Sequence, residues 1–166
     1  MRIKLIFFLI GLFLLVPHLS GCGFHLRGSQ TPYTYPFQTV TICPDDYFDP
    51  IYKELRYNLE AKKIKVLSKD CPNTPRIIIL NHKFIERPFA YGADGEIRCE
   101  TLTLEMEYEY EYYSNNQKKT RRHTIIVRRF RQLNINQNLA DMAEKAIIED
   151  EMIIDVVQQL LVQLTV

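Results

Sequence analysis

The residues with the clearest chemical purpose lie near the start of the chain, where Cys22 directly follows the small residues Ser20 and Gly21. Two cations precede an uncharged apolar run from Leu5 to Val16. A basic end, an apolar middle and small residues in this order are typical of a secretory signal. The run is shorter than the roughly 20 residues that a membrane-spanning helix needs. We therefore interpret residues 1–21 as a signal peptide that is removed.

The thiol of Cys22 predicts a specific modification. Leu19-Ser20-Gly21-Cys22 resembles a bacterial lipobox, in which the thiol receives diacylglycerol, the chain is cut before the cysteine, and the new amine is acylated. This chemistry needs a thiol as the nucleophile. Stable anchoring takes more than one acyl chain, at ~0.8 kcal/mol for each buried CH₂ group. We expect a triacylated Cys22, and the alternative is an unmodified cysteine behind an ordinary signal.

The composition of the remaining chain limits the protein class. Residues 22–166 have the size of one domain, and the whole chain carries 21 basic and 20 acidic residues. Balanced charge argues against a general nucleic-acid-binding protein. Cys43, Cys71 and Cys99 allow at most one internal disulfide in an oxidising compartment, and their spacing is unlike that of a zinc site. We expect buried thiols, and the sequence assigns no pair.

The residues at the mature N-terminus carry a family resemblance. Cys22-Gly23-Phe24-His25-Leu26-Arg27 resembles the start of the lipopolysaccharide-assembly lipoprotein family LptE, also called RlpB. The resemblance implies a non-enzymatic sandwich of two helices and four strands, anchored by its lipid to the periplasmic side of the outer membrane. It also implies binding to lipopolysaccharide and plugging of a β-barrel partner, LptD. Gly at position 23, where Asp would favour the inner membrane, agrees with that location.

The periodicity of the chain predicts one α+β domain over residues 37–166, after an extended tether at residues 22–36. Two helices should pack on one face of a roughly four-stranded, largely antiparallel mixed sheet. The predicted elements are a strand at Phe37–Cys43, a helix from Pro50 to about Lys62 capped by Asp49, a short strand at 64–67, a buried strand at 76–86, and a helix from Leu139 to near Leu164. We expect Pro88 to interrupt the chain just after the buried strand.

The longest strand pattern runs from Ile97 to Tyr113 and returns from about Lys118 to Leu133. Even-numbered residues from Leu102 to Tyr112 are apolar or aromatic, whereas odd-numbered residues from Thr101 to Glu111 are Thr or Glu, so we expect one dry face and one wet face. Matching apolar to apolar and opposite charges sets Met106 opposite Ile125, Leu104 opposite Val127, and Glu109 opposite Arg122. Paired residue numbers should then have an odd sum.

No enzyme motif is present in the sequence. There is no glycine-rich phosphate loop, no G-x-S-x-G elbow and no H-E-x-x-H zinc motif, and the four histidines are scattered. We expect no catalytic residue, no metal and no cofactor. The alternative to the LptE-like role is a periplasm-facing lipoprotein that is an enzyme or binds a small ligand on a similar α+β scaffold.

Two groups of residues are candidates for binding. Arginine suits bidentate contact with phosphate, and the resemblance implies lipopolysaccharide as the ligand; pairing with the glutamates of the neighbouring strand is the alternative. Tyrosine is favoured at interfaces, and the resemblance implies LptD as the partner; covering the dry face of the sheet is the alternative. The basic candidates are Arg128, Arg129 and Arg131, together with Lys145, which the resemblance implies through the family's basic residue near the start of the last helix. The aromatic candidates are Tyr108, Tyr110, Tyr112 and Tyr113.

Overall fold

The computed structural model describes residues 34–44, 46–67, 74–115, 117–133 and 138–165. The predicted signal peptide, Cys22 and nearly all of the predicted tether lie outside these ranges, so they stay predictions. The elements in chain order are β1 (Thr39–Cys43), α2 (Pro50–Ala61), β2 (Lys65–Leu67), β3 (Arg76–Tyr91), β4 (Ile97–Ser114), β5 (Gln117–Gln132) and α3 (Asn138–Gln163).

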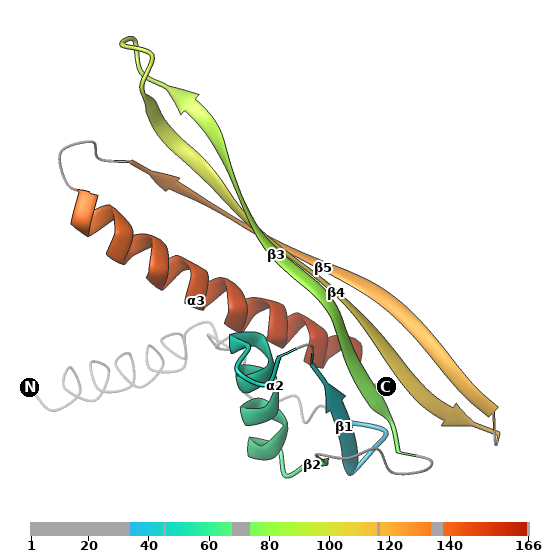
Figure 1. The fold of residues 1–166 in the computed structure, drawn as a ribbon. Helices are drawn as coiled ribbons and strands as arrows, with labels where there is room; N and C mark the ends of the chain where they lie inside the picture. The colour runs from blue at the N-terminus through green and yellow to red at the C-terminus, as the bar shows by residue number, and fades with distance from the viewer. Residues whose placement is uncertain (1–33, 45, 68–73, 116, 134–137, 166) are drawn as a thin grey trace, which may run out of the picture. The chain divides into compact units, whose positions relative to one another are not determined.

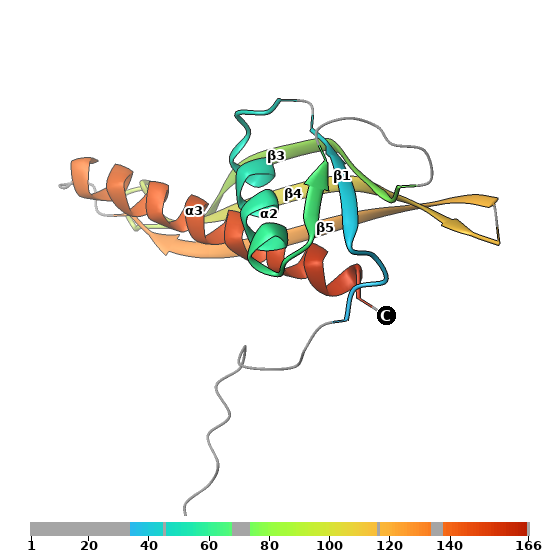
Figure 2. The same ribbon diagram turned by 90° about the horizontal axis from the view of Figure 1, so that it is seen from below.

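The strands form one mixed sheet that carries both helices on a single face (Figures 1 and 2). The strand order is β2-β1-β3-β4-β5. β1 pairs in parallel with β2 and β3, whereas β3, β4 and β5 pair antiparallel. The predicted α+β class is therefore confirmed. The sheet has five strands where roughly four were predicted, because the short segment Lys65–Leu67 joins its edge as β2.

The pairing of β4 with β5 has the predicted register. Met106 lies opposite Ile125, and Glu109 lies opposite Arg122. The same odd sum holds along the whole ladder without a bulge. Because a slip of one residue would turn every side chain to the other face, the burial of one β4 face is enough to fix this register.

The core lies between the sheet and the two helices. Leu104, Met106 and Tyr108 of β4 are each 0% exposed. Burying a large apolar side chain stabilises the fold by about 1.5–3 kcal/mol. These three side chains therefore strongly favour the docking of the helices on this face of the sheet. The helices complete the core with Ile51, Leu55 and Leu59 from α2 and Met152, Val156, Val157, Leu160 and Leu161 from α3.

The opposite face of β4 is polar, as predicted, but it is not wet along its whole length. Glu111 is only 8% exposed. Lys118 Nζ lies 2.7 Å from one of its carboxylate oxygens, and Arg76 Nη1 lies 3.5 Å from the other. Two cations thus compensate for the lost hydration of this carboxylate, which a buried acid requires.

Helix α2 begins as the sequence predicts. The Asp49 carboxylate accepts hydrogen bonds from the backbone amides of Ile51 and Tyr52 at 2.7 and 3.4 Å. Pro50 takes the first helical position, where its missing N–H costs nothing. The helix ends at Ala61, and Lys63 with a φ of 62° turns the chain towards β2.

Strand β3 is longer than predicted, because Pro88 does not interrupt it. β1 pairs with β3 only as far as Ile78, so beyond that point β3 has a neighbour on the β4 side alone. A proline, which lacks an N–H, is tolerated on such an edge. The ladder between β3 and β4 shifts register between Ile79 and Asn81 and again around Ala90; nothing in the sequence pattern indicates these bulges.

Candidate functional site

The basic cluster predicted on β5 divides between the two faces of the sheet. Arg128 pairs with Thr103 of β4 and is exposed on the face away from the helices, here called the open face. Arg129 and Arg131 alternate with it and lie on the face that the helices cover. The structure therefore brings Arg129 and Arg131 towards α3 and Lys145, and it keeps Arg128 apart from them.

Arg131 is the most buried member of the cluster. Its side chain is 8% exposed, and its Nε lies 2.5 Å from Glu100 Oε1, whose side chain is 13% exposed. Its Nη1 donates a 2.6 Å hydrogen bond to the backbone carbonyl of Asp141 in the first turn of α3. Arg131 thus ties β5 to β4 and to the start of α3, which is a structural role.

Arg129 and Lys145 are also paired with acids. Arg129 contacts Asp155 of α3. Lys145 contacts Glu86 of β3, and Glu149 one turn further along α3 lies 3.8 Å away. The hydrogen bond to Glu86 raises the pKa of Lys145, so this amine stays charged.

Charge balance decides what the helix-side group can do. Arg129, Arg131 and Lys145 supply three positive charges, and the four carboxylates that contact them offset this charge. A phosphate could bind there only by displacing a carboxylate. The alternative of charge pairing therefore describes the geometry of these three side chains.

The open face carries two arginines without carboxylate partners among the described residues, close to exposed aromatic side chains. Arg128 has no carboxylate partner among the described residues, and neither has Arg87, which lies on the same face of β3 opposite Thr101. Phe89 and Phe130, 64% and 65% exposed, meet there with ring centroids 5.1 Å apart.

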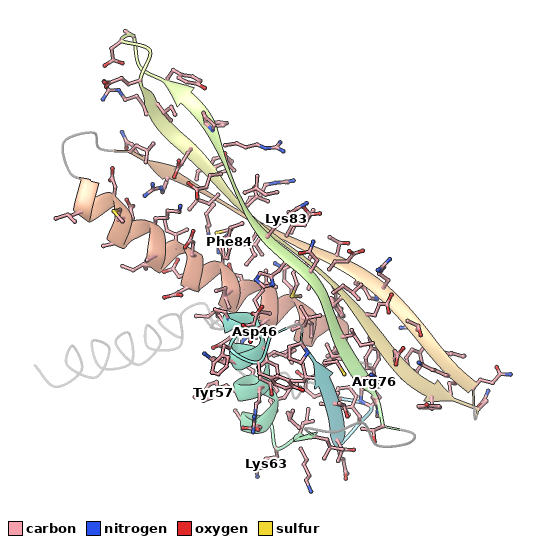
Figure 3. All side chains as sticks on the ribbon, viewed as in Figure 1. Asp46, Tyr57, Lys63, Arg76, Lys83 and Phe84 are labelled. Atoms are coloured by element: carbon pink, nitrogen blue, oxygen red, sulfur yellow. The ribbon has the colours of Figure 1, made fainter. Side chains whose placement is uncertain are left out.

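The alternation of faces can be followed in Figure 3, which labels two successive residues of β3: Lys83 lies on the open face and Phe84 on the helix side.

The four candidate tyrosines run from the core to the surface along β4. Tyr108 is 0% exposed, and its hydroxyl donates a 2.6 Å hydrogen bond to Gln163 of α3. Tyr110 is 8% exposed and stacks on half-buried Tyr112, with ring centroids 5.2 Å apart. Tyr113, near the hairpin tip, is 44% exposed. Burial raises the pKa of both Tyr108 and Tyr110 to about 12. Only Tyr112 and Tyr113 therefore offer ring surface to a partner in this conformation.

Other predicted features are placed briefly. Cys43 and Cys99 are half-buried, and Cys71 lies outside the described residues. Within the described ranges, no group of three or more His, Cys, Asp and Glu side chains could hold a metal ion. None of the helices in those ranges combines the length and apolarity needed to cross a membrane.

Sequence reasoning missed Arg87, Phe89 and Phe130 as members of one surface. A signal for part of it exists: the register places Arg122 on the wet face, and counting by twos from it reaches Arg128 and Phe130. The same counting places Arg129 and Arg131 on the other face of β5 from Arg128. Phe89 could not be placed in this way, because it follows Pro88 and adjoins a register shift.

Comparisons with known proteins place this geometry in context. No family model matches the chain. A relative from Photorhabdus laumondii, named LPS-assembly lipoprotein LptE, is 27% identical over 104 residues, which is 63% of this chain and 56% of that protein. The match thus spans little more than half of the relative's length.

Similar structures come from three other bacteria. The rare lipoprotein B of Shewanella oneidensis has a TM-score of 0.68 at 14% identity, covering 75% of this chain and 91% of that one. A lipoprotein B from Nitrosomonas europaea has a TM-score of 0.70 at 24% identity, covering 87% and 91%. A minor lipoprotein from Acinetobacter baumannii has a TM-score of 0.63 at 14% identity, covering 79% and 92%. These likenesses show a shared fold, and together with the sequence match they confirm that this chain resembles the LptE family of lipopolysaccharide-assembly lipoproteins.

Proposed function

We propose that this protein is a non-enzymatic outer-membrane lipoprotein, anchored through acylated Cys22 on the periplasmic side, that assists lipopolysaccharide assembly by binding and plugging an LptD β-barrel. The observation that carries the proposal is the sequence match to LPS-assembly lipoprotein LptE. The lipobox-like residues at 19–22 support the anchor, and the shared lipoprotein fold supports the same architecture.

The β4–β5 hairpin tip is the part we assign to the barrel. Its strands present Tyr112 and Tyr113 beside Lys118 and Lys119. Tyrosine combines a large apolar ring with a polar end, and the interior of a porin-type barrel is polar. A charged, tyrosine-bearing hairpin is therefore suited to docking inside such a lumen.

Co-purification tests the partner. Tagged full-length protein, extracted from outer membranes in mild detergent, should bring down a large β-barrel protein in a stable complex. Deletion of residues 114–117 should weaken this complex while leaving the far-ultraviolet circular dichroism of the isolated protein unchanged. A matched deletion in the β3–β4 turn, residues 92–95, should leave the complex intact. Recovery of the protein free of any barrel would refute the proposal.

We further propose that lipopolysaccharide phosphates contact Arg128 first, together with Arg87 on the open face. Both guanidinium groups are exposed and without carboxylate partners in the described part of the chain. The other three basic candidates, Arg129, Arg131 and Lys145, would join only by giving up their carboxylates.

Binding to purified lipopolysaccharide tests this order. Arg128→Gln should weaken binding more than Arg122→Gln, a matched control on the same strand and face whose guanidinium already lies 3.3 Å from both Glu107 and Glu109. A truncated hydrogen bond to a charged group is worth about 1.5–3 kcal/mol, or at least about tenfold in affinity. Equal affinity of the two variants would remove Arg128 from the contact.

A further inference from the structure

A partly open cavity of about 550 Å³ lies at the opposite end of α3 from the basic cluster. The start of β1, the end of β4, the start of β5 and the last turn of α3 form its wall. From Lys145 to Gln163 the helix advances about 27 Å, at 1.5 Å per residue. The surface assigned above to lipopolysaccharide phosphates is also separate, because Arg128 lies on the opposite face of β5 and about 23 Å along the strand from the cavity residue Arg121, at about 3.3 Å per residue. The cavity volume falls within the range of small-molecule sites, about 300–1,000 Å³.

Arg121 is the charged group of this cavity. Its guanidinium carbon lies 5.2 Å from the centroid of the Tyr112 ring, which in turn stacks on Tyr110. This stack holds the guanidinium plane in place, so less side-chain entropy is lost when it binds. Among the residues that the structure describes, no acid lines the cavity beside it.

A comparison with the other arginines shows what distinguishes Arg121. Six arginines of the described residues contact a carboxylate: Arg56, Arg76, Arg98, Arg122, Arg129 and Arg131. Arg121 contacts none in that part of the chain, and unlike Arg87 and Arg128 it lines a cavity. A cation that is oriented by aromatic rings and lacks a counter-ion favours an anionic ligand.

The rest of the wall narrows the class of ligand. The rings of half-buried Tyr112 and exposed Tyr113 lie in this wall together with the amides of Gln38 and Gln163. The Gln163 amide oxygen already accepts from Tyr108, but a purely apolar ligand would leave the Gln163 amide nitrogen, the Gln38 amide and the guanidinium without partners, which costs free energy. A bare inorganic ion would leave the rings uncovered. The ligand that satisfies all three groups has hydroxyls, flat apolar faces and one negative charge.

We propose that this cavity binds an acidic sugar, with Arg121 holding its carboxylate or phosphate. The sugar hydroxyls bond to the wall amides, and the ring packs against the aromatic side chains. The raised pKa of Tyr110, about 12 from its burial, keeps that phenol neutral beside the anion.

Saturation-transfer NMR on the full-length protein in detergent micelles tests the site with three free sugars: glucuronate, glucose 6-phosphate and neutral glucose. The two acidic sugars should bind at least about tenfold more tightly than glucose. Their relative affinities identify whether a carboxylate or a phosphate is preferred. The assay contains neither lipopolysaccharide nor a barrel, so its outcome is independent of the assembly role.

Variants assign the effect to Arg121. Arg121→Gln should reduce the affinity for the acidic sugars to that for glucose, and Arg121→Lys, which keeps the charge without the planar fork, should fall between. Arg122→Gln, one residue away on the other face, should bind like the wild-type protein. Thermal melts of each variant verify that the fold is retained. Equal binding of all three sugars, absence of binding, or full affinity in a folded Arg121→Gln protein would overturn the proposal.

Discussion

Replacing Arg131 with glutamine should lower the free energy of unfolding by about 3 kcal/mol. The Arg131 and Glu100 side chains are 8% and 13% exposed, and each loses most of its hydration on folding. Removing one partner of a buried ion pair costs about 3–5 kcal/mol, because the other charge stays behind unpaired. We take the lower end because Lys145 also attracts Glu100.

Urea denaturation of the full-length protein, followed by circular dichroism, measures this change. With a slope of about 2 kcal/mol/M, the midpoint should fall by about 1.5 M. Arg128→Gln is the matched control, because it removes the same group from the open face, where substitutions usually change stability by less than about 0.5 kcal/mol. The double variant Arg131→Gln/Glu100→Gln should recover at least half of the loss, since it leaves no lone buried charge.

Two results would refute this reasoning. If Arg131→Gln unfolded at the wild-type midpoint, the pair would contribute nothing and Arg131 would be free to act in binding. If Arg128→Gln lost as much stability as Arg131→Gln, the division of the basic cluster between two faces would be wrong.

Three other changes have defined outcomes. Asp49→Ala should lower the free energy of unfolding by about 1 kcal/mol through loss of the α2 cap, whereas Asp49→Asn should lose only a few tenths, as calorimetry or urea denaturation would show. Lys145→Gln should cost less than about 1 kcal/mol in the same assay, because its ion pairs are partly exposed. Tyr108 and Tyr110 should remain neutral in the folded protein between pH 10 and about pH 12, whereas the same tyrosines ionise near pH 10 in the unfolded chain. Their contribution to the free energy of unfolding should therefore be complete below pH 10 and should fall as the pH rises through that window. Tyrosinate absorbance that rises fully near pH 10 without unfolding would contradict this.

The β4–β5 hairpin shows what period-two alternation can establish. Its two strands each sort apolar from polar residues over many positions, so one register satisfies both faces and the sequence identifies it. The same alternation predicts which β4 tyrosines are core residues: Tyr108 and Tyr110 continue the buried stripe of Met106 and are covered by the helices.

The features that escaped prediction depend on tertiary neighbours. Pro88 reads as a strand end in isolation, yet it is tolerated because β1 is too short to pair with β3 at that point. β1 itself ends at Cys43, directly before Pro44 and far along the chain from Pro88. Likewise, the pairing of Arg129 with Asp155 depends on how α3 lies across the sheet.

The uninterrupted β4–β5 ladder also limits how this protein can diverge. Deleting one residue from the middle of either strand would turn the following side chains to the other face of the sheet. The glutamates would then face the core and apolar side chains such as Met106 would face solvent, unless a β-bulge accommodated the deletion. Shortening or extending the arm in paired steps at its tip leaves every other contact as it was. Natural relatives should therefore differ in hairpin length by even numbers of residues, and an alignment of their arms would display this parity.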